Sequence, residues 1–353
     1  GSENVIFVHV TLAPSLDVVG EQKTKPTQHS VQELRRIGIQ PDVLCVRCSS
    51  TLQEKTRKKI SMFTNVTEKD VLSCHDVKSI FMVPQILFEQ GLVDLIFKKF
   101  AKVGYVNASE NWDEWNRIVN SMESDGDTIN IAMVGKYVTL ADSYVSVNHA
   151  LKHAGASINR PVKIDWIDSE TLNGNIETLR KYNGILVPGG FGTRGSEGII
   201  ETANFARENN IPYLGICFGF QLAAVSFARN VCNLTDANST EIENETKNPI
   251  IDLLPEQDDV TNLGGSLRLG ANKINIQENS MAYEIYNSNT VSKRHRHRYE
   301  FNKKYLESFN KNGMIFSGES DDGRRMEMLE IPSHKFFLGV QFHPEFNSRP
   351  GFP

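Results

Sequence analysis

The sequence lacks the long apolar runs and the paired cysteines that mark two large classes of proteins. None of its apolar runs approaches the roughly 20 residues of a membrane-spanning helix, and no signal peptide is visible. Its five cysteines are an odd number and suggest a reducing compartment rather than a disulfide framework. We therefore expect a cytoplasmic protein with no membrane partner. The 39% hydrophobic and 23% charged residues are ordinary for a globular chain, and 353 residues suggest about two domains.

The sequence also lacks a net positive charge and a complete set of metal ligands. Its net charge of −5 argues against a general polyanion binder, so we expect no nucleic-acid partner. The basic run RHRHR, residues 294–298, is isolated, and alone it is typical of a solvated charged loop. Cys45 and Cys48 form a C-x-x-C pair without a second pair or clustered histidines. The surrounding VLCVRC alternates like a strand, which favours a structural role over zinc binding or redox chemistry.

One cysteine lies between a short apolar run and a helix-like apolar pattern, in YLGICFGFQ at residues 213–221. This pattern predicts a sharp strand-to-helix turn at Cys217, with Gly215 and Gly219 where side chains would crowd the bend. The free N–H groups and the dipole of the helix start favour a thiolate, which is the nucleophile needed to attack a carboxamide. A buried core cysteine is the ordinary alternative. The two glycines and a downstream partner favour the catalytic interpretation.

That partner is FLGVQFHPEF, residues 337–346. An apolar run typical of a buried strand ends at His343, and Pro344 holds that residue in an extended conformation. Residues two apart on an extended backbone point the same way, so the Glu345 carboxylate can orient the imidazole ring. Cys217, His343 and Glu345 then form a triad of nucleophile, general base and orienting carboxylate.

A glycine-rich turn follows the apolar run in ILVPGGFGTRG, residues 185–195. Such a loop can bind phosphate, but no G-x-x-x-x-G-K-[ST] pattern supports a P-loop here. Beside a nucleophilic cysteine, an oxyanion hole fits better. We expect the N–H groups of Gly190 and Phe218 to face the charge that develops on a tetrahedral intermediate.

These three segments, in this order, resemble the class I (triad-type) glutamine amidotransferases over about residues 129–353. Five further stretches resemble the CTP synthase family from end to end: NVIFVHVTLAP, GEQKTKPTQHSVQELRRIGIQPDVLCVR, ANSTE, LGGSLRLG and RHRHRYE. The resemblance implies an α/β chain of two doubly wound domains. Residues 1–103 would be the C-terminal part of a P-loop-like amidoligase domain, residues 104–128 a linker, and residues 129–353 a flavodoxin-like amidotransferase domain.

The resemblance implies a glutamine pocket around the triad. Arg298 would meet the α-carboxylate of glutamine, Glu241 would meet its α-ammonium group, and Gln221 would line the same pocket. A zwitterionic substrate needs one charge of each sign, and this pair supplies them. The complete set of residues implied for the oxyanion hole and glutamine is Gly190, Phe218, Gly219, Phe220, Gln221, Glu241 and Arg298.

The first third of the sequence indicates alternating strands and helices. We expect a buried strand over Val5 to Leu12, a helix over Ser30 to Ile37, a strand over Pro41 to Cys48, and helical segments in 76–100. Such alternation indicates a doubly wound domain. In the linker, apolar residues at helical spacing between Trp112 and Met122 predict a short amphipathic helix that docks on one domain. Residues 242–262 have few periodic apolar positions and are typical of a mobile loop.

Two ammonium groups, two hydroxyls and an amide lie on KTKPTQ, which we expect to be a short loop fixed by proline. The resemblance implies that this loop binds UTP or CTP, that a second segment holds the ATP adenine, and that Arg268 contacts the activator GTP in a lid. The residues implied for UTP or CTP are Lys23, Thr24, Lys25, Pro26, Thr27, Gln28 and Lys59, and those for ATP are His75, Asp76 and Val77.

In CTP synthases the phosphate-binding glycine-rich loop and the magnesium-binding carboxylates lie upstream of the NVIFVHVTLAP strand, at which this sequence starts. We therefore expect no metal ligands in this chain and no ATP-dependent ligase activity from it alone, and the complete enzyme would use Mg²⁺ and ATP. The resemblance further implies that GTP activates it and that it assembles into homotetramers and filaments.

Two other functions stay open. Another amidotransferase subunit, making GMP, carbamoyl phosphate or anthranilate, shares the triad but does not explain KTKPTQHS in the same chain. A non-catalytic assembly or regulatory module is the second alternative. The intact Cys217, His343 and Glu345 argue against that idle role.

Overall fold

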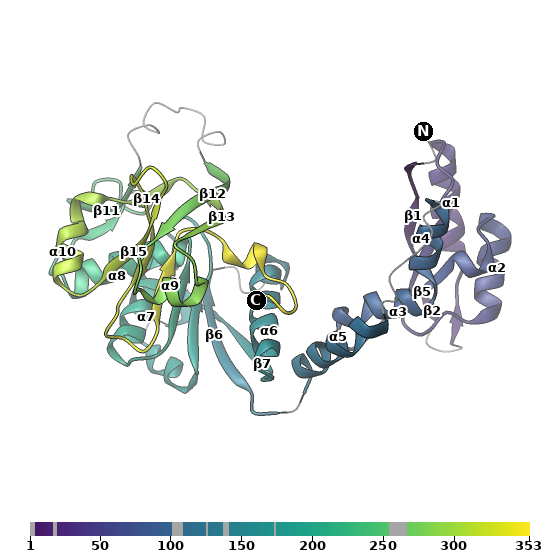
Figure 1. The fold of residues 1–353 in the computed structure, drawn as a ribbon, viewed down its shortest axis with the longest axis horizontal. Helices are drawn as coiled ribbons and strands as arrows, with labels where there is room; N and C mark the ends of the chain where they lie inside the picture. The colour runs from purple at the N-terminus through teal and green to yellow at the C-terminus, as the bar shows by residue number, and fades with distance from the viewer. Residues whose placement is uncertain are drawn as a thin grey trace. The chain divides into compact units, whose positions relative to one another are not determined.

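The computed structural model describes residues 4–16, 20–100, 109–124, 126–136, 141–172, 174–253 and 267–353. The chain divides into two compact units, Gly1–Glu123 and Ser124–Pro353 (Figure 1). Among the described residues no single helix has the length and apolarity to cross a membrane. Ile80–Glu89 and Leu92–Lys99 satisfy that test only as a pair, and they are bent by 60°.

The first unit is built on a parallel sheet of three strands in the order β1-β4-β5, which are Val8–Leu12, Val43–Cys48 and Val71–His75. Its helices are α1 (Lys25–Arg36), α2 (Glu54–Thr64), α3 (Val83–Glu89), α4 (Leu92–Lys99) and α5 (Ser109–Met122), and Ser15–Leu16 and Glu21–Gln22 form a two-stranded ribbon, β2 and β3. Cys45 and Cys48 are both buried, but they belong to core clusters on opposite sides of β4. The two thiols therefore do not share a site.

Helix α5 lies within the predicted linker and packs on the first unit. The Trp115 indole N–H donates to the Phe81 carbonyl oxygen at 2.8 Å, and the Trp112 ring lies 5.3 Å from that of Phe88. The expected amphipathic helix is therefore present, and it docks on the unit that precedes it.

Two expectations for the first unit are wrong. The strand predicted to be buried over Val5 to Leu12 begins at Val8, and Val8, Val10 and Leu12 are 41%, 63% and 52% exposed. The reason is that, within the described part of the chain, β1 is an edge strand of this sheet and pairs only with β4. The segment predicted as a loop, residues 23–28, is mostly the first turn of α1, which begins at Lys25. Pro26 suits a helix start because its missing N–H would have no partner there.

The second unit contains a nine-stranded sheet in the order β13-β12-β15-β16-β17-β9-β8-β6-β7. Strands β17, β9, β8, β6 and β7 run parallel, and the other half of the sheet is antiparallel. The strands are β6 (Ile129–Gly135), β7 (Val162–Asp168), β8 (Gly184–Val187), β9 (Tyr213–Ile216), β12 (Arg268–Ile276), β13 (Thr290–His297), β15 (Ile315–Ser320), β16 (Met326–Glu330) and β17 (Phe337–Val340). The predicted α/β class is confirmed.

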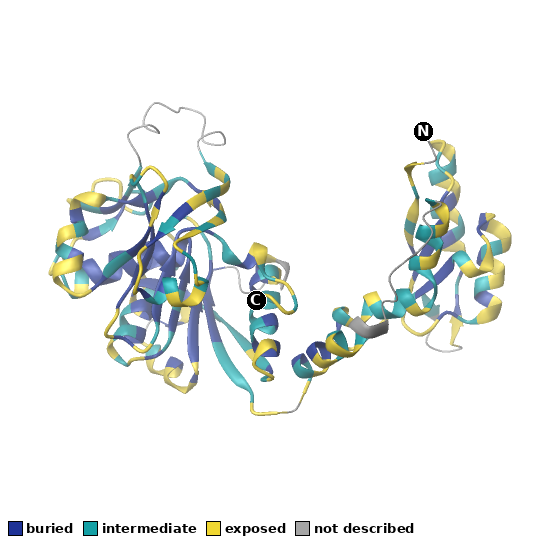
Figure 2. Ribbon diagram, viewed as in Figure 1, coloured by how far each residue is buried: buried dark blue, intermediate teal, exposed yellow. Residues whose placement is uncertain are grey.

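Among the described residues, a smaller sheet and five α-helices complete this unit. The sheet joins β10 (Ala237–Ser239), β11 (Asn248–Leu253) and β14 (Tyr299–Phe301), and the helices are α6 (Val145–Ser157), α7 (Ser196–Glu208), α8 (Phe218–Asn230), α9 (Met281–Tyr286) and α10 (Leu306–Lys311). Every residue of α8 from 218 to 228 is buried. Figure 2 shows the buried residues concentrated in the central strands and the helices that face them.

Two further expectations need correction. The RHRHR run is not a loop, because residues 290–297 form strand β13, in which His295 and His297 are buried and Arg294 and Arg296 are exposed. Within 242–262, expected to be a loop, residues 248–253 form β11, and residues 254–262 lie outside the described part.

Candidate functional site

Cys217 lies at the strand-to-helix turn between β9 and α8, with φ +52° and ψ −97°. This backbone conformation is strained for a residue with a side chain, and such strain is typical of functional sites. The turn needs its glycines. A Cβ on Gly215 would lie 2.6 Å from the carbonyl carbon of Gly219, and one on Gly219 would lie 2.4 Å from the Val187 oxygen. The close packing of β8, β9 and α8 thus presents the thiol at the edge of the sheet.

His343 and Glu345 follow β17, the strand next to β9, and form a short ion pair. The His343 Nδ1 atom lies 2.7 Å from Glu345 Oε1. Burial alone would lower the pKa of His343, but hydrogen bonds to Cys217 and Glu345 and their charges outweigh it and raise the pKa to about 10. The raised pKa of His343 favours its protonated form.

The triad opens into a cavity of about 720 Å³ in the second unit. Of the residues expected to bind glutamine, Gly190, Gln221, Glu241 and Arg298 line it together with Cys217, His343 and Glu345. Phe218 and Phe220 are instead 1% and 0% exposed and belong to the hydrophobic core, so only their backbone could serve the site. The N–H of Phe218 heads helix α8 and has no carbonyl partner within that helix.

The cavity carries side chains of opposite charge. Glu241 Oε1 accepts a hydrogen bond from the Gly192 N–H at 2.8 Å, which ties the carboxylate to the glycine-rich loop after β8. Arg298 follows β13 and lines the same cavity. A carboxylate and a guanidinium in one cavity match the α-ammonium and α-carboxylate groups of a free amino acid.

Lys136, which directly follows β6, holds the glycine-rich loop. Its side chain is 7% exposed, its ammonium group donates to the carbonyl oxygens of Phe191, at 2.9 Å, and Gly192, and it lies 4.2 Å from the Phe218 ring centroid. Burial lowers the pKa of Lys136 to about 8, although the negative charges of Glu241 and Glu170 act to raise it. The sequence analysis did not identify Lys136, because a single lysine after an apolar strand does not by itself indicate a functional role.

Replacing Lys136 by Met should lower the rate of glutamine hydrolysis, because the loop that carries Gly190 loses two hydrogen bonds and shifts. We expect kcat to fall about 10- to 100-fold with a small change in KM, since misplacement of a group by about 1 Å costs up to a hundredfold. Lys163→Met, at an exposed lysine of the same unit, is the matched control. Equal kcat values for the two variants would contradict the bracing role of Lys136.

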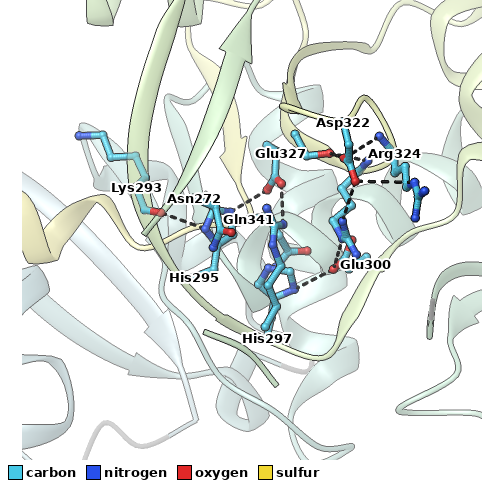
Figure 3. A network of polar contacts seen from close by, with 12 residues as sticks. Asn272, Lys293, His295, His297, Glu300, Asp322, Arg324, Glu327 and Gln341 are labelled. Atoms are coloured by element: carbon cyan, nitrogen blue, oxygen red, sulfur yellow. Dashed lines mark hydrogen bonds and ion pairs between the residues drawn. The ribbon is translucent and has the colours of Figure 1, made fainter. Parts of the chain in front are cut away.

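A buried network of charged residues lies beside the cavity (Figure 3). Glu327 is 0% exposed, and its two carboxylate oxygens accept from Arg268 Nη1 at 2.6 Å and His295 Nε2 at 2.9 Å. Burial would raise the pKa of Glu327, but these two partners lower it. Arg268, expected to contact GTP in a lid, already has an anionic partner in this structure.

The same cluster contains potential metal ligands. Atoms of His295, His297 and Glu327 lie within 4.8 Å of one another. The guanidinium of Arg268 occupies one Glu327 oxygen, and both His295 nitrogens contact acceptor oxygens, of Glu327 and of Lys293. A divalent cation would therefore have to displace an arginine and break existing hydrogen bonds, so we assign no metal site to this cluster.

His297 is neutral in the folded state, because burial and the neighbouring His295 lower its pKa to about 3. The unfolded chain binds this proton near pH 6.5, so the free energy of unfolding should fall as the pH falls from 6.5 toward 3. His297→Gln should reduce that slope by up to about 1.4 kcal/mol per pH unit. Urea unfolding at pH 4.5 and 6.5 measures the slope, with the exposed His29→Gln as control. An unchanged slope would show that the pKa of His297 is the same in the folded and unfolded states.

In the first unit, two of the lysines predicted for a nucleotide site gather around one carboxylate. Lys23 Nζ lies 2.7 Å from Glu21 Oε2, and the charges of Lys55 and Lys59 also help to lower the pKa of Glu21. Thr27 is 0% exposed and its hydroxyl donates to the Leu12 oxygen, so that hydroxyl is structural. Asp76 pairs with Arg47 at 2.5 Å.

The comparisons with known proteins agree with this geometry. Residues 139–352 match the model of the class I glutamine amidotransferases, and residues 1–102 match that of the CTP synthase N-terminus. The chain is 51% identical over 355 aligned positions to a CTP synthase of Pyrococcus abyssi and 50% identical to that of Thermococcus kodakarensis. The chain belongs to the CTP synthase family. It aligns over 100% of its own length and spans 66% of the length of both relatives.

A solved structure of the family is similar to the second unit. It is the glutaminase domain of Trypanosoma brucei CTP synthase with bound acivicin, which is 39% identical to this chain with a TM-score of 0.60. The similarity covers 64% of this chain and 89% of that domain. The second unit is thus the class I glutamine amidotransferase domain of a CTP synthase family member.

Proposed function

We propose that this chain hydrolyses glutamine through Cys217, His343 and Glu345 and that the released ammonia serves the ATP-dependent amination of UTP to CTP. The observation that carries the proposal is the triad itself. A cysteine with a strained backbone, at the start of a helix, and a paired His343–Glu345 line one cavity with Glu241 and Arg298. The chain alone would retain only the glutaminase half of the reaction.

The chemistry follows from these positions. The Cys217 thiolate attacks the γ-carboxamide carbon of glutamine, and the N–H groups of Gly190 and Phe218 stabilise the oxyanion. Protonated His343 gives its proton to the departing nitrogen, so ammonia leaves and a γ-glutamyl thioester remains. Neutral His343 then takes a proton from water, which attacks the thioester and releases glutamate. Glu345 holds the imidazole in position throughout.

The nucleotide half of the proposal rests on residues of the first unit. Lys23 and Lys59 both act on the Glu21 carboxylate, and we propose that the triphosphate of UTP or CTP takes the place of this carboxylate as their anionic partner. His75, Asp76 and Val77 follow or end β5, where the ATP adenine would bind. From the family we further propose that the complete enzyme binds Mg²⁺ and is activated by GTP. It would form homotetramers and filaments and would be located in the cytoplasm.

Release of ammonia from glutamine by the chain, with and without GTP, tests the glutaminase half. The same chain supplied with UTP, ATP and ammonia should form no CTP. Ammonia release identifies an active glutaminase, whereas its absence in both conditions would favour the non-catalytic assembly or regulatory module. CTP formation would show that the chain holds a complete ligase site.

A further inference from the structure

Gln341 directly follows β17 and reaches the nucleophile. It is 1% exposed, its backbone N–H donates to the Glu327 oxygen at 2.9 Å, and its side-chain Nε2 lies 3.7 Å from Cys217 Sγ. His343 is two residues further along the chain, and it lines the same cavity as Cys217. The sulfur atom therefore has an amide on one side in addition to the imidazole.

The orientation of that amide is fixed by a chain of hydrogen bonds. The Tyr299 carbonyl oxygen can only accept, so the group of Gln221 that lies 2.8 Å from it is the NH₂. The same NH₂ donates to Gln341 Oε1 at 3.2 Å. The oxygen of Gln341 thus faces Gln221, and its NH₂ faces the sulfur. Both glutamines are buried, at 3% and 1% exposed, so water does not compete for these bonds.

We propose that Gln341 is a positioning residue that stabilises the Cys217 thiolate, and that Gln221 holds Gln341 in the orientation that does so. The inference rests on the proposed glutaminase function and adds to it. A donor aimed at sulfur favours the thiolate over the thiol, because only the anion is a strong acceptor. Gln221, expected to contact glutamine, acts in this account through Gln341 on the nucleophile.

Other charged and titratable groups face the same sulfur or its cavity. They are His343 and Glu345 after β17, Arg296, His297 and Arg298 in and after β13, and Glu241 after β10. The variants proposed below keep all of them, so a change in the titration of Cys217 reports on the Gln341 amide itself.

The test measures the rate of Cys217 alkylation by iodoacetamide as a function of pH, because only the thiolate displaces iodide. Gln341→Met keeps the side-chain volume and removes the donor. We expect the midpoint of the pH profile to rise by about 0.5–1 pH unit, so that at pH values below the midpoint the rate falls roughly three- to tenfold, which is the range for loss of an ordinary hydrogen bond. Glutamine KM should stay unchanged while kcat falls. Cys217→Ser identifies the labelled residue among the five cysteines.

Gln221→Met is the second variant, because it frees the Gln341 amide to flip while leaving that side chain in place. It should shift the midpoint in the same direction by a smaller amount, and it decides the matter if Gln341→Met does not fold. A midpoint unchanged from the wild type in the folded variant would overturn the inference. Alkylation requires no glutamine turnover, so a chain that shifts its midpoint but releases no ammonia would contradict only the proposed function.

Discussion

Replacing Cys217 by Ser should reduce glutamine hydrolysis by at least about a thousandfold. A serine hydroxyl at this position is not ionised at neutral pH, and loss of a nucleophile removes most of the catalysis that its partners provide. His343 would also lose the hydrogen bond to Cys217 that helps to raise its pKa. Ammonia release, assayed at saturating glutamine, measures the effect.

Cys232→Ser is the matched control, because Cys232 is a half-buried cysteine of the same unit that does not line the cavity. Its hydrolysis rate should equal that of the unmodified chain. Near-wild-type activity of Cys217→Ser would contradict the role of the nucleophile, whereas loss of folding in that variant would indicate a structural role.

Arg298→Ala should weaken glutamine binding by about 1.5–3 kcal/mol, which raises KM roughly 10- to 150-fold, because a charge-assisted hydrogen bond to the α-carboxylate is lost. Glu241→Gln should act in the same direction on the α-ammonium contact. The amide oxygen of the new glutamine can still accept the hydrogen bond from the Gly192 N–H, so the loop stays attached to this side chain. The substitution therefore removes only the negative charge. Steady-state kinetics with glutamine separate KM from kcat.

Substrate analogues provide the control for this pair. An analogue without the α-carboxylate should bind the wild type poorly and should lose little further affinity in Arg298→Ala. An analogue without the α-ammonium group should behave likewise with Glu241→Gln. Unchanged glutamine kinetics in both variants would remove these two residues from the glutamine site.

The strand-to-helix turn at Cys217 could be predicted because the residues that determine it are close in sequence. Gly215, Cys217 and Gly219 are close in sequence. The apolar residues before Cys217 follow a strand pattern, and those after it follow a helix pattern. The placement of His343 and Glu345 in the same cavity depends on the pairing of β17 with β9, in which Val340 lies opposite Ile216 in a parallel register. The sequence does not show that pairing.

Other features were present in the sequence but were interpreted wrongly. The strict alternation of RHRHR is a strand pattern, with histidines on the buried face and arginines on the exposed face. The segment was predicted to be a loop because of its high charge. Pro26 marked a helix start rather than a loop. The exposure of Val10 could not be read from an apolar run, because it depends on the position of β1 at the sheet edge.

The contacts of Lys136 and Gln341 could not be predicted from sequence. Lys136 reaches carbonyl oxygens 55 and 56 positions away, and Gln341 reaches the sulfur 124 positions away. Both side chains are buried at the ends of parallel strands, where the order of strands in the sheet decides which residues meet. The sequence carries no periodic signal for such single polar side chains.

The most direct test of the central claim is the detection of the covalent intermediate on Cys217. The chain is mixed with glutamine, quenched in acid within one turnover, digested and analysed by mass spectrometry. The account predicts a γ-glutamyl thioester on the peptide that contains Cys217, and it predicts that Cys217→Ser shows no such thioester. Release of ammonia with no adduct on Cys217, or with the adduct on another residue, would contradict the account.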